Sequence, residues 1–205
     1  MAKEFQQHDK KILILRAAVK VFSKKGFHLA KIEEIAEEAG VGKGTIYEYF
    51  NSKKNLFEEM FIRINELYFK NINEFLDSDK EVKEKIFLFI YTHLKFISEH
   101  KDMAKIMMNE HHLFSEKIMQ KTIKQRQKLI KNIEEVVSQG VATGEIAVPE
   151  PWLIAQIIGG ITMNISSNII FEEIDKELTE IAQKATDILW IGISAKKDYQ
   201  TWEQE

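Results

Sequence analysis

The segment GVGKGTIYEY, residues 40–49, combines three glycines and a lysine with one hydroxyl and two phenol side chains. Glycine-rich segments with a lysine are typical of loops whose backbone N–H groups surround a phosphate. A Walker-type loop, however, needs glycine where Glu37 stands and serine or threonine where Gly44 stands. The dinucleotide-binding pattern needs a glycine where Thr45 stands and a strand before it. These residues therefore do not predict a nucleotide-binding enzyme.

The same glycines suit a turn between two short helices. Gly40 can adopt the left-handed conformation that ends a helix, and Val41 can fill the angle between that helix and the next. Two short helices joined by such a turn form a helix-turn-helix, whose second helix enters the major groove of DNA. The spacing alone is equally compatible with an ordinary tight helical corner that has a solvated face.

A helix after this turn would point Ile46 and Phe50 inward and leave most other side chains outside. Lysine, hydroxyl and phenol groups donate hydrogen bonds to phosphate oxygens, and a threonine can also meet a base edge. The outward side chains that we expect near DNA are those of Lys43, Thr45, Tyr47, Glu48 and Tyr49.

Apolar residues recur at helical spacing along almost the whole chain, and only two prolines occur. The sequence therefore predicts an all-α fold. Asp9 is a candidate N-cap of the first helix and Gly26 its stop, while Ser52 is a candidate N-cap of a long helix over 53–75. The other helices are predicted at residues 32–39, around 46–50, and at 80–99, 102–114, 116–139, 152–172 and 176–194.

Charge is unevenly distributed along the chain. Residues 1–55 carry 11 Lys/Arg and 7 Asp/Glu, whereas residues 56–205 carry 18 and 25. An end that can approach a polyanion is thus joined to an acidic body. The chain has no cysteine, and we expect neither a membrane-length apolar run nor a signal peptide. The expected location is the cytoplasm, away from any membrane.

Residues 10–57 resemble the N-terminal domain of TetR-type (TetR/AcrR) transcriptional regulators. The resemblance rests on the motifs GF, IAEEAGV, KGTIYEYF and SKKNLF, which follow one another in fixed register. It implies an all-α homodimer with a three-helix, helix-turn-helix DNA-binding domain over 1–52 and an effector-binding and dimerisation domain over 53–205. It also implies that Lys53 contacts a phosphate and that Lys31 lies near the DNA backbone.

This sequence departs from the family pattern at several positions. Ala30 and Gly42 replace a threonine and a serine, which removes one phosphate contact and one helix cap. Glu48 and Glu33 stand where other members place histidine and arginine, and a glutamate accepts from cytosine but repels phosphate, so the operator sequence stays open. The residues that the resemblance assigns to the recognition helix are Lys43, Gly44, Thr45, Tyr47 and Tyr49.

Residues 53–205 offer fewer motifs. Methionines at helical spacing can line an adaptable cavity, although such a stripe is more often plain core. Adjacent histidines point about 100° apart on a helix, and neither His-Glu-x-x-His nor Glu-x-x-His spacing occurs, so we expect no metal site. With no cysteine and no Gly-x-Ser-x-Gly elbow, we expect no catalytic residue and no cofactor. The candidate pocket residues are Met103, Met107, Met108, His111, Phe114 and Met163.

The segment KIMQKTIKQRQKLIK, residues 117–131, carries six basic residues and no acid inside the acidic body. Its lysines step by four, three, four and three, so they share one helix face. The plain interpretation is a solvated face; the alternative is a docking surface for the anionic headgroup of an acyl-CoA beside an apolar tunnel. The later segment SQGVATGEI resembles the acyl-CoA-responsive branch of the family. The lysines proposed to contact such a ligand are Lys121, Lys124 and Lys128.

The segments 152–172 and 176–194 are apolar on more than one face, which predicts two partners for each. In the TetR family this pair forms the dimer interface, and burial inside one subunit is the alternative. The sequence thus predicts a dimeric, ligand-responsive regulator, a repressor released from a palindromic operator by a small apolar or amphipathic effector. A second hypothesis is a helical lipid carrier or enzyme with a vestigial DNA-binding module.

Overall fold

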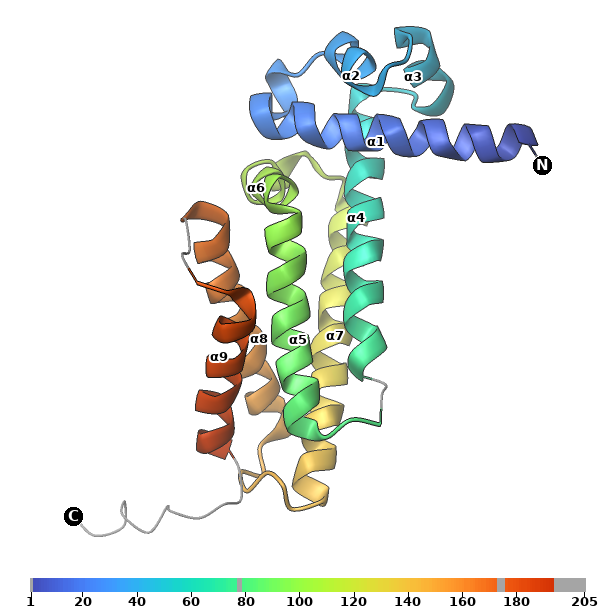
Figure 1. Cartoon of the computed structure of the whole chain (residues 1–205). Coiled ribbons are helices and arrows are strands. Elements are labelled where there is room, and N and C mark those ends of the chain that lie inside the picture. The colour runs from blue at the N-terminus through green and yellow to red at the C-terminus, as the bar shows by residue number, and fades with distance from the viewer. Residues whose placement is uncertain (1, 77–78, 173–175, 194–205) are drawn as a thin grey trace. The chain divides into compact units, whose positions relative to one another are not determined.

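The computed structural model describes residues 2–76, 79–172 and 176–193, with the side chains of residues 2–9, 73–76 and 111 outside that description. These ranges form α-helices and one 3-10 turn, without a β-strand (Figure 1). The all-α prediction is confirmed. The chain divides into two compact units, Met1–Leu67 with His100–Thr122 (unit 1) and Tyr68–Glu99 with Ile123–Glu205 (unit 2). The functional boundary that we placed at residue 52 stays a prediction.

Unit 1 is built around an aromatic core. The ring of Phe57 lies 5.2 Å from those of Phe22 and Phe114, and the ring of Phe61 lies 4.2 Å from that of Phe114. Helix α1 packs against both α2 and α6 around this core (Figure 1). The elements of unit 1 are α1 (Ala2–Leu29), α2 (Ile32–Ala39), α3 (Lys43–Tyr49), α6 (Lys101–Asn109) and η1 (His111–Leu113), with the first parts of α4 (Lys53–Leu76) and α7 (Glu116–Ala142).

Local backbone signals set most helix ends in unit 1. Gly26 breaks α1 as predicted, with φ 71° and ψ 170°. Helix α1 begins at Ala2, however, so the prediction that Asp9 caps it is wrong. Ser52 caps α4 as predicted, because its Oγ accepts a backbone N–H from the first turn at 3.0 Å. The single helix predicted at 102–114 is also wrong, since the chain leaves α6 and forms the separate turn η1.

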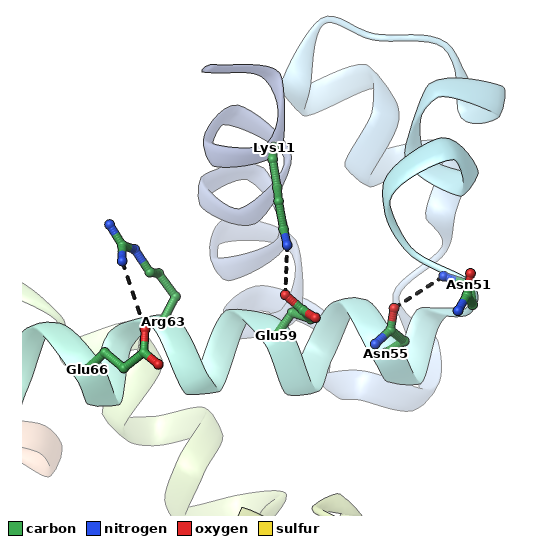
Figure 2. Close-up of polar contacts among 6 residues, drawn as sticks. All are labelled: Lys11, Asn51, Asn55, Glu59, Arg63 and Glu66. Atoms are coloured by element: carbon green, nitrogen blue, oxygen red, sulfur yellow. Dashed lines mark hydrogen bonds and ion pairs between the residues drawn. The ribbon is translucent and has the colours of Figure 1, made fainter. Parts of the chain in front are cut away.

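Polar side chains connect α4 to its surroundings, as Figure 2 shows. Lys11 on α1 reaches Glu59 on α4 at 2.8 Å, and the backbone N–H of Asn51 donates to Asn55 Oδ1 at 3.2 Å. Exposed ion pairs of this kind contribute about 0–1 kcal/mol each. The buried aromatic rings therefore contribute more than these pairs to holding α1 against α4.

Lys53 joins the start of α4 to the end of α1. Its Nζ donates to the backbone carbonyls of Phe27 at 2.7 Å, His28 at 3.2 Å and Ala30 at 2.9 Å. It also lies 4.6 Å from the centre of the Phe27 ring. An ammonium has three N–H donors, so these three carbonyls use all of them.

We expect Lys53→Met to lower the free energy of unfolding by about 2 kcal/mol, because three charge-assisted hydrogen bonds are lost and methionine keeps most of the aliphatic volume. Urea unfolding followed by circular dichroism measures the change. Lys54→Met, at the exposed neighbouring position, is the matched control and should stay within about 0.5 kcal/mol of the parent. Equal stability of the two variants would contradict a structural role for Lys53.

Unit 2 is a helical bundle with an aliphatic core. Helix α5 (Val82–Glu99) packs against both α8 (Pro151–Phe171) and α9 (Leu178–Ile193), and the later parts of α4 and α7 complete the core (Figure 1). The close approach of α7 and α8 depends on Gly159, where an added Cβ would lie 2.8 Å from Ile130 Cδ1. The predicted pair of apolar helices at the end of the chain is confirmed.

Helix α8 is as long and as apolar as a membrane-spanning segment, which the sequence analysis did not expect. Its 21 residues carry no charge, and by length and composition it is apolar enough to cross a membrane, with a mean hydropathy of 1.4. The expectation that no such run exists is therefore wrong. One side of α8 is buried in unit 2, including the hydroxyls of Thr162 and Ser166, which bond to carbonyls of their own helix. A core helix of a bundle needs the same apolar composition.

A buried polar chain crosses the core of unit 2. The phenol of Tyr68 lies 2.6 Å from His93 Nδ1, and His93 Nε2 lies 2.6 Å from Ser166 Oγ. Ser166 donates its single hydroxyl proton to the carbonyl of Thr162 at 2.7 Å, so its oxygen must accept from Nε2–H. His93 is therefore the neutral Nε2–H tautomer, and its Nδ1 accepts from Tyr68. Burial raises the pKa of Tyr68 above its usual value, which keeps this phenol protonated.

Burial lowers the pKa of His93 from 6.5 to about 4. The unfolded chain therefore binds this proton more readily, so the contribution of His93 is complete above pH 6.5 and is lost as the pH falls toward 4. We expect the parent to lose about 3 kcal/mol more stability than His93→Gln between pH 6.5 and 4, because glutamine keeps a donor and an acceptor but does not titrate. Urea unfolding at several pH values measures this, and parallel curves for the two proteins would contradict it.

Candidate nucleic-acid interface and effector site

The turn between α2 and α3 has the hydrogen bonds of a Schellman motif. Gly40 adopts φ 66° and ψ 33°, the left-handed conformation predicted for it. Its N–H donates to the carbonyl of Glu37 at 3.1 Å, and the N–H of Val41 donates to the carbonyl of Ala36 at 2.9 Å. Helix α3 begins after Gly42, which offers no side-chain cap. Backbone hydrogen bonds thus fix the angle between the two helices.

Helix α3 buries one side and exposes the other. Ile46 and Phe50 are buried, as predicted. Tyr47 is 45% exposed, which leaves its phenol able to reach a partner outside the chain. Among the other predicted DNA contacts, Lys43, Gly44 and Glu48 are exposed, whereas Thr45 and Tyr49 are half-buried and Tyr49 packs against the core of unit 1.

Two of the predicted DNA contacts bind each other. Lys43 Nζ on α3 lies 2.6 Å from Glu33 Oε1 on α2, and both side chains are more than half exposed. This hydrogen bond lowers the pKa of Glu33 and raises that of Lys43, so both remain charged at neutral pH. A phosphate that approaches Lys43 must therefore compete with a carboxylate.

The start of α2 is capped by a residue that the sequence analysis missed. Ala30 is buried, so no hydroxyl stands where the family has a threonine. Glu34 Oε2 instead accepts the backbone N–H of Lys31 at 3.2 Å, while Glu34 Oε1 takes an ion pair from Lys25 at 2.8 Å. An acid three residues after an N-cap is the sequence signal that predicts this contact. The side chain of Lys31 is exposed at the helix start.

The hydrogen bonds of Lys53 compete with the phosphate contact that the family resemblance implies for it. All three of its donors point to carbonyls of the same unit. A phosphate could bind this ammonium only by displacing one of them. The phosphate contact stays a prediction, and the observed partners give Lys53 a role in the fold.

The candidate effector residues are divided between the two units and differ in burial. Met103 and Phe114 are buried in the aromatic core of unit 1, and Met107 packs against that core. Met108 is 46% exposed, and Met163 is 48% exposed on α8 in unit 2. The side chain of His111 lies outside the described residues. Met103 and Phe114 therefore act first as packing residues, which is the plain interpretation of the methionine stripe.

The lysine row on α7 is exposed throughout. Lys117, Lys121, Lys124, Lys128 and Lys131 all lie on the surface. Two of them have acidic partners: Lys121 lies 3.6 Å from Glu66, and Lys131 lies 2.8 Å from Glu134. The row presents several cations along one helix face, a suitable surface for a polyanionic group.

Helices α8 and α9 share an apolar groove of about 310 Å³, lined in part by Ile161, Ile165, Ile181 and Ile188. The same two helices carry further large apolar side chains that are exposed. The most exposed are Trp152 at 60%, Ile188 at 72% and Ile191 at 75%. Exposed apolar surface of this extent is typical of a protein–protein interface.

Two family models match the chain, in order and without overlap. The model described as "Bacterial regulatory proteins, tetR family" matches residues 14–60, and "Tetracyclin repressor-like, C-terminal domain" matches residues 79–167. Together they span more than half of the chain. The first contains the helix-turn-helix, and the second contains α5, α6 and α7 in full.

Two proteins of Bacillus subtilis (strain 168) illustrate the relatives. The "Fatty acid metabolism regulator protein" is 25% identical over 174 residues, which are 85% of this chain and 84% of that protein. The "Uncharacterized HTH-type transcriptional regulator YhgD" is 27% identical over 150 residues, 73% of this chain and 78% of that protein. The first of these names a metabolic process, and the second names only a regulator.

Solved structures show the same fold. The transcriptional regulator FadR from Bacillus subtilis in complex with stearoyl-CoA has a TM-score of 0.72 and 23% identity, covering 89% of this chain and 98% of that one. The ketosteroid transcriptional regulator KstR2 of Mycobacterium tuberculosis has a TM-score of 0.72 and 20% identity, covering 92% and 95%. The chain belongs to the TetR family of bacterial regulatory proteins, and it is a ligand-responsive, DNA-binding transcriptional regulator rather than an enzyme.

Proposed function

We propose that the protein is a dimeric cytoplasmic repressor that binds a pseudo-palindromic operator through α3 and is released by a long-chain acyl-CoA. The observation that carries the effector class is the exposed lysine row on α7, set in an otherwise acidic body. Coenzyme A carries several phosphate charges, which such a row can neutralise. The relatives named for fatty acid metabolism and for bound stearoyl-CoA support the same class.

The DNA-facing surface combines few cations with two acids. Lys31 and Lys43 are the exposed lysines at the starts of α2 and α3, and Tyr47 adds a phenol donor. Glu33 neutralises part of this charge by binding Lys43. A protein with few phosphate contacts depends more on matched base edges for its affinity. We infer that the Glu33–Lys43 pair restrains binding to unrelated DNA.

Operator release requires a ligand that prefers one conformation over another. Helix α4 is a single helix from Lys53 to Leu76, with its first part in unit 1 and its last part in unit 2. We propose that the effector shifts α4, so that the two α3 helices of the dimer no longer match successive major grooves. The dimer surface in this proposal is the exposed apolar face of α8 and α9 around their groove.

Glu33→Gln should raise affinity for an unrelated duplex several-fold and make the salt dependence of log K steeper by about one unit, because Lys43 is freed for a phosphate. Fluorescence anisotropy between 50 and 300 mM salt, about the range in which such contacts are resolved, measures both quantities. Glu38→Gln is the matched control: Glu38 also holds a lysine, Lys20 at 2.8 Å, but lies about 140° around α2. An equal rise in both variants would contradict the assignment.

Stearoyl-CoA at stoichiometric amounts should release the protein from a duplex taken from the region upstream of its own gene. We expect Lys121, Lys124 and Lys128 changed together to Gln to weaken stearoyl-CoA binding about tenfold, while operator affinity without ligand stays unchanged. The matched control replaces Lys24, Lys80 and Lys95, three exposed lysines outside α4 and α7, by Gln. Anisotropy on labelled operator and calorimetry with stearoyl-CoA measure the two affinities.

The possible outcomes separate the parts of the proposal. Operator binding that ignores stearoyl-CoA would keep the regulator and remove acyl-CoA as its effector. Equal weakening by both lysine triples would remove the row on α7 as the headgroup site. A helical carrier with a vestigial DNA-binding module would instead bind lipid and show weak, salt-sensitive affinity for any duplex, without preference for the operator.

A further inference from the structure

Three potential metal ligands meet on the surface of unit 1. His28 lies in the turn after Gly26, Glu110 directly follows α6, and His112 lies in η1. One ligand atom from each lies within 4.8 Å of the others, and His112 Nε2 lies 3.9 Å from Glu110 Oε2. His28 is more than 80 residues from the other two in the sequence, so no spacing within one helix predicts the group.

The carboxylate of Glu110 is held in place before any ion arrives. Its side chain is only 16% exposed, and its Oε1 accepts the backbone N–H of Phe27 at 3.3 Å. The chain can pass so close because residue 26 is glycine: an added Cβ there would lie 3.1 Å from the same oxygen. Oε1 is thus anchored to the backbone, and Oε2 faces the imidazole of His112. Outer hydrogen bonds of this kind orient metal-binding carboxylates.

The two imidazoles come from different elements, His28 from the end of α1 and His112 from η1. The ring of His28 packs edge-on against that of Phe27, with centroids 5.5 Å apart, and both histidines are exposed. In a tetrahedral site with bonds of about 2.05 Å, neighbouring ligand atoms lie about 3.4 Å apart. The separation of 3.9 Å between His112 Nε2 and Glu110 Oε2, and the upper limit of 4.8 Å for the group, are close to this value, and exposed histidines can change rotamer.

The geometry points to a binding site for a divalent transition-metal ion, with Zn²⁺ as the type case, formed by His28, Glu110 and His112. Two imidazoles and one carboxylate suit Zn²⁺ and its neighbours, and discriminate against Mg²⁺ and Ca²⁺, which prefer all-oxygen sites. Three protein ligands leave a fourth position for water, so the site is open and exchangeable. It is independent of the proposed effector.

Metal binding would connect two elements that unit 1 now joins by weaker contacts. His28 belongs to the turn whose carbonyls Lys53 holds, and that turn leads into α2. Glu110 and His112 belong to the end of α6 and to η1. A bound ion would therefore fasten the entry of the helix-turn-helix to α6 and η1.

Calorimetric titration of the full-length, untagged protein with ZnCl₂ in a non-chelating buffer near neutral pH tests the site. We expect one Zn²⁺ per subunit and a loss of affinity of at least about tenfold in each of His28→Ala, His112→Ala and Glu110→Gln. Glutamine at 110 keeps an oxygen for the N–H of Phe27, so the turn is preserved. His100→Ala, at the opposite end of α6, is the matched control and should bind Zn²⁺ as the parent does.

A second experiment measures the thermal stability of the protein with and without Zn²⁺. Zn²⁺ at about 100 times its Kd should raise Tm by about 5–10 °C in the parent and in His100→Ala, but not in His28→Ala. Unchanged Zn²⁺ affinity in His28→Ala, or loss confined to the variants at Glu110 and His112, would overturn the connection between the two elements. Uptake by the parent that equals uptake by the His28→Ala/His112→Ala double variant would overturn the site itself.

Discussion

The ammonium of Lys53 satisfies three backbone carbonyls where the end of α1, the entry to α2 and the start of α4 meet. Helix ends leave carbonyls without intrahelical partners, and Gly26 turns the chain so that these carbonyls converge. A positive charge is favourable there because it faces the negative end of the helix. The orientation of α2, and with it the placement of α3, depends on this turn.

Glu110 contacts the same turn, because its carboxylate accepts the backbone N–H of Phe27. Lys53 on α4 thus binds the backbone carbonyls of this turn, and Glu110 at the end of α6 binds one of its backbone N–H groups. Neither contact depends on a residue of the recognition helix. The side chains that we propose to contact DNA can therefore vary while the frame of unit 1 remains unchanged.

In unit 2, helix α8 is apolar on both its buried and its exposed sides. The hydroxyls on the buried side donate to carbonyls of α8 itself. Ser166 also ends the row of hydrogen bonds that runs from Tyr68 through His93. The exposed side presents apolar residues that a single subunit leaves in water. In our proposal, dimerisation covers the exposed side, whereas the hydrogen bonds on the buried side keep polar atoms satisfied in an aliphatic core.

The sequence by itself determined what depends on near neighbours: the helices, the breaks at Gly26 and Gly40, the cap at Ser52 and the inward positions of Ile46 and Phe50. These follow from backbone preferences and from apolar spacing of 3.6 residues. Only the tertiary structure decided that Lys43 faces Glu33, that Met103 and Phe114 belong to a core, and that His28 meets Glu110 and His112. Such contacts join residues that are separated along the chain, and their partners are set by the packing of whole helices, which no local pattern specifies.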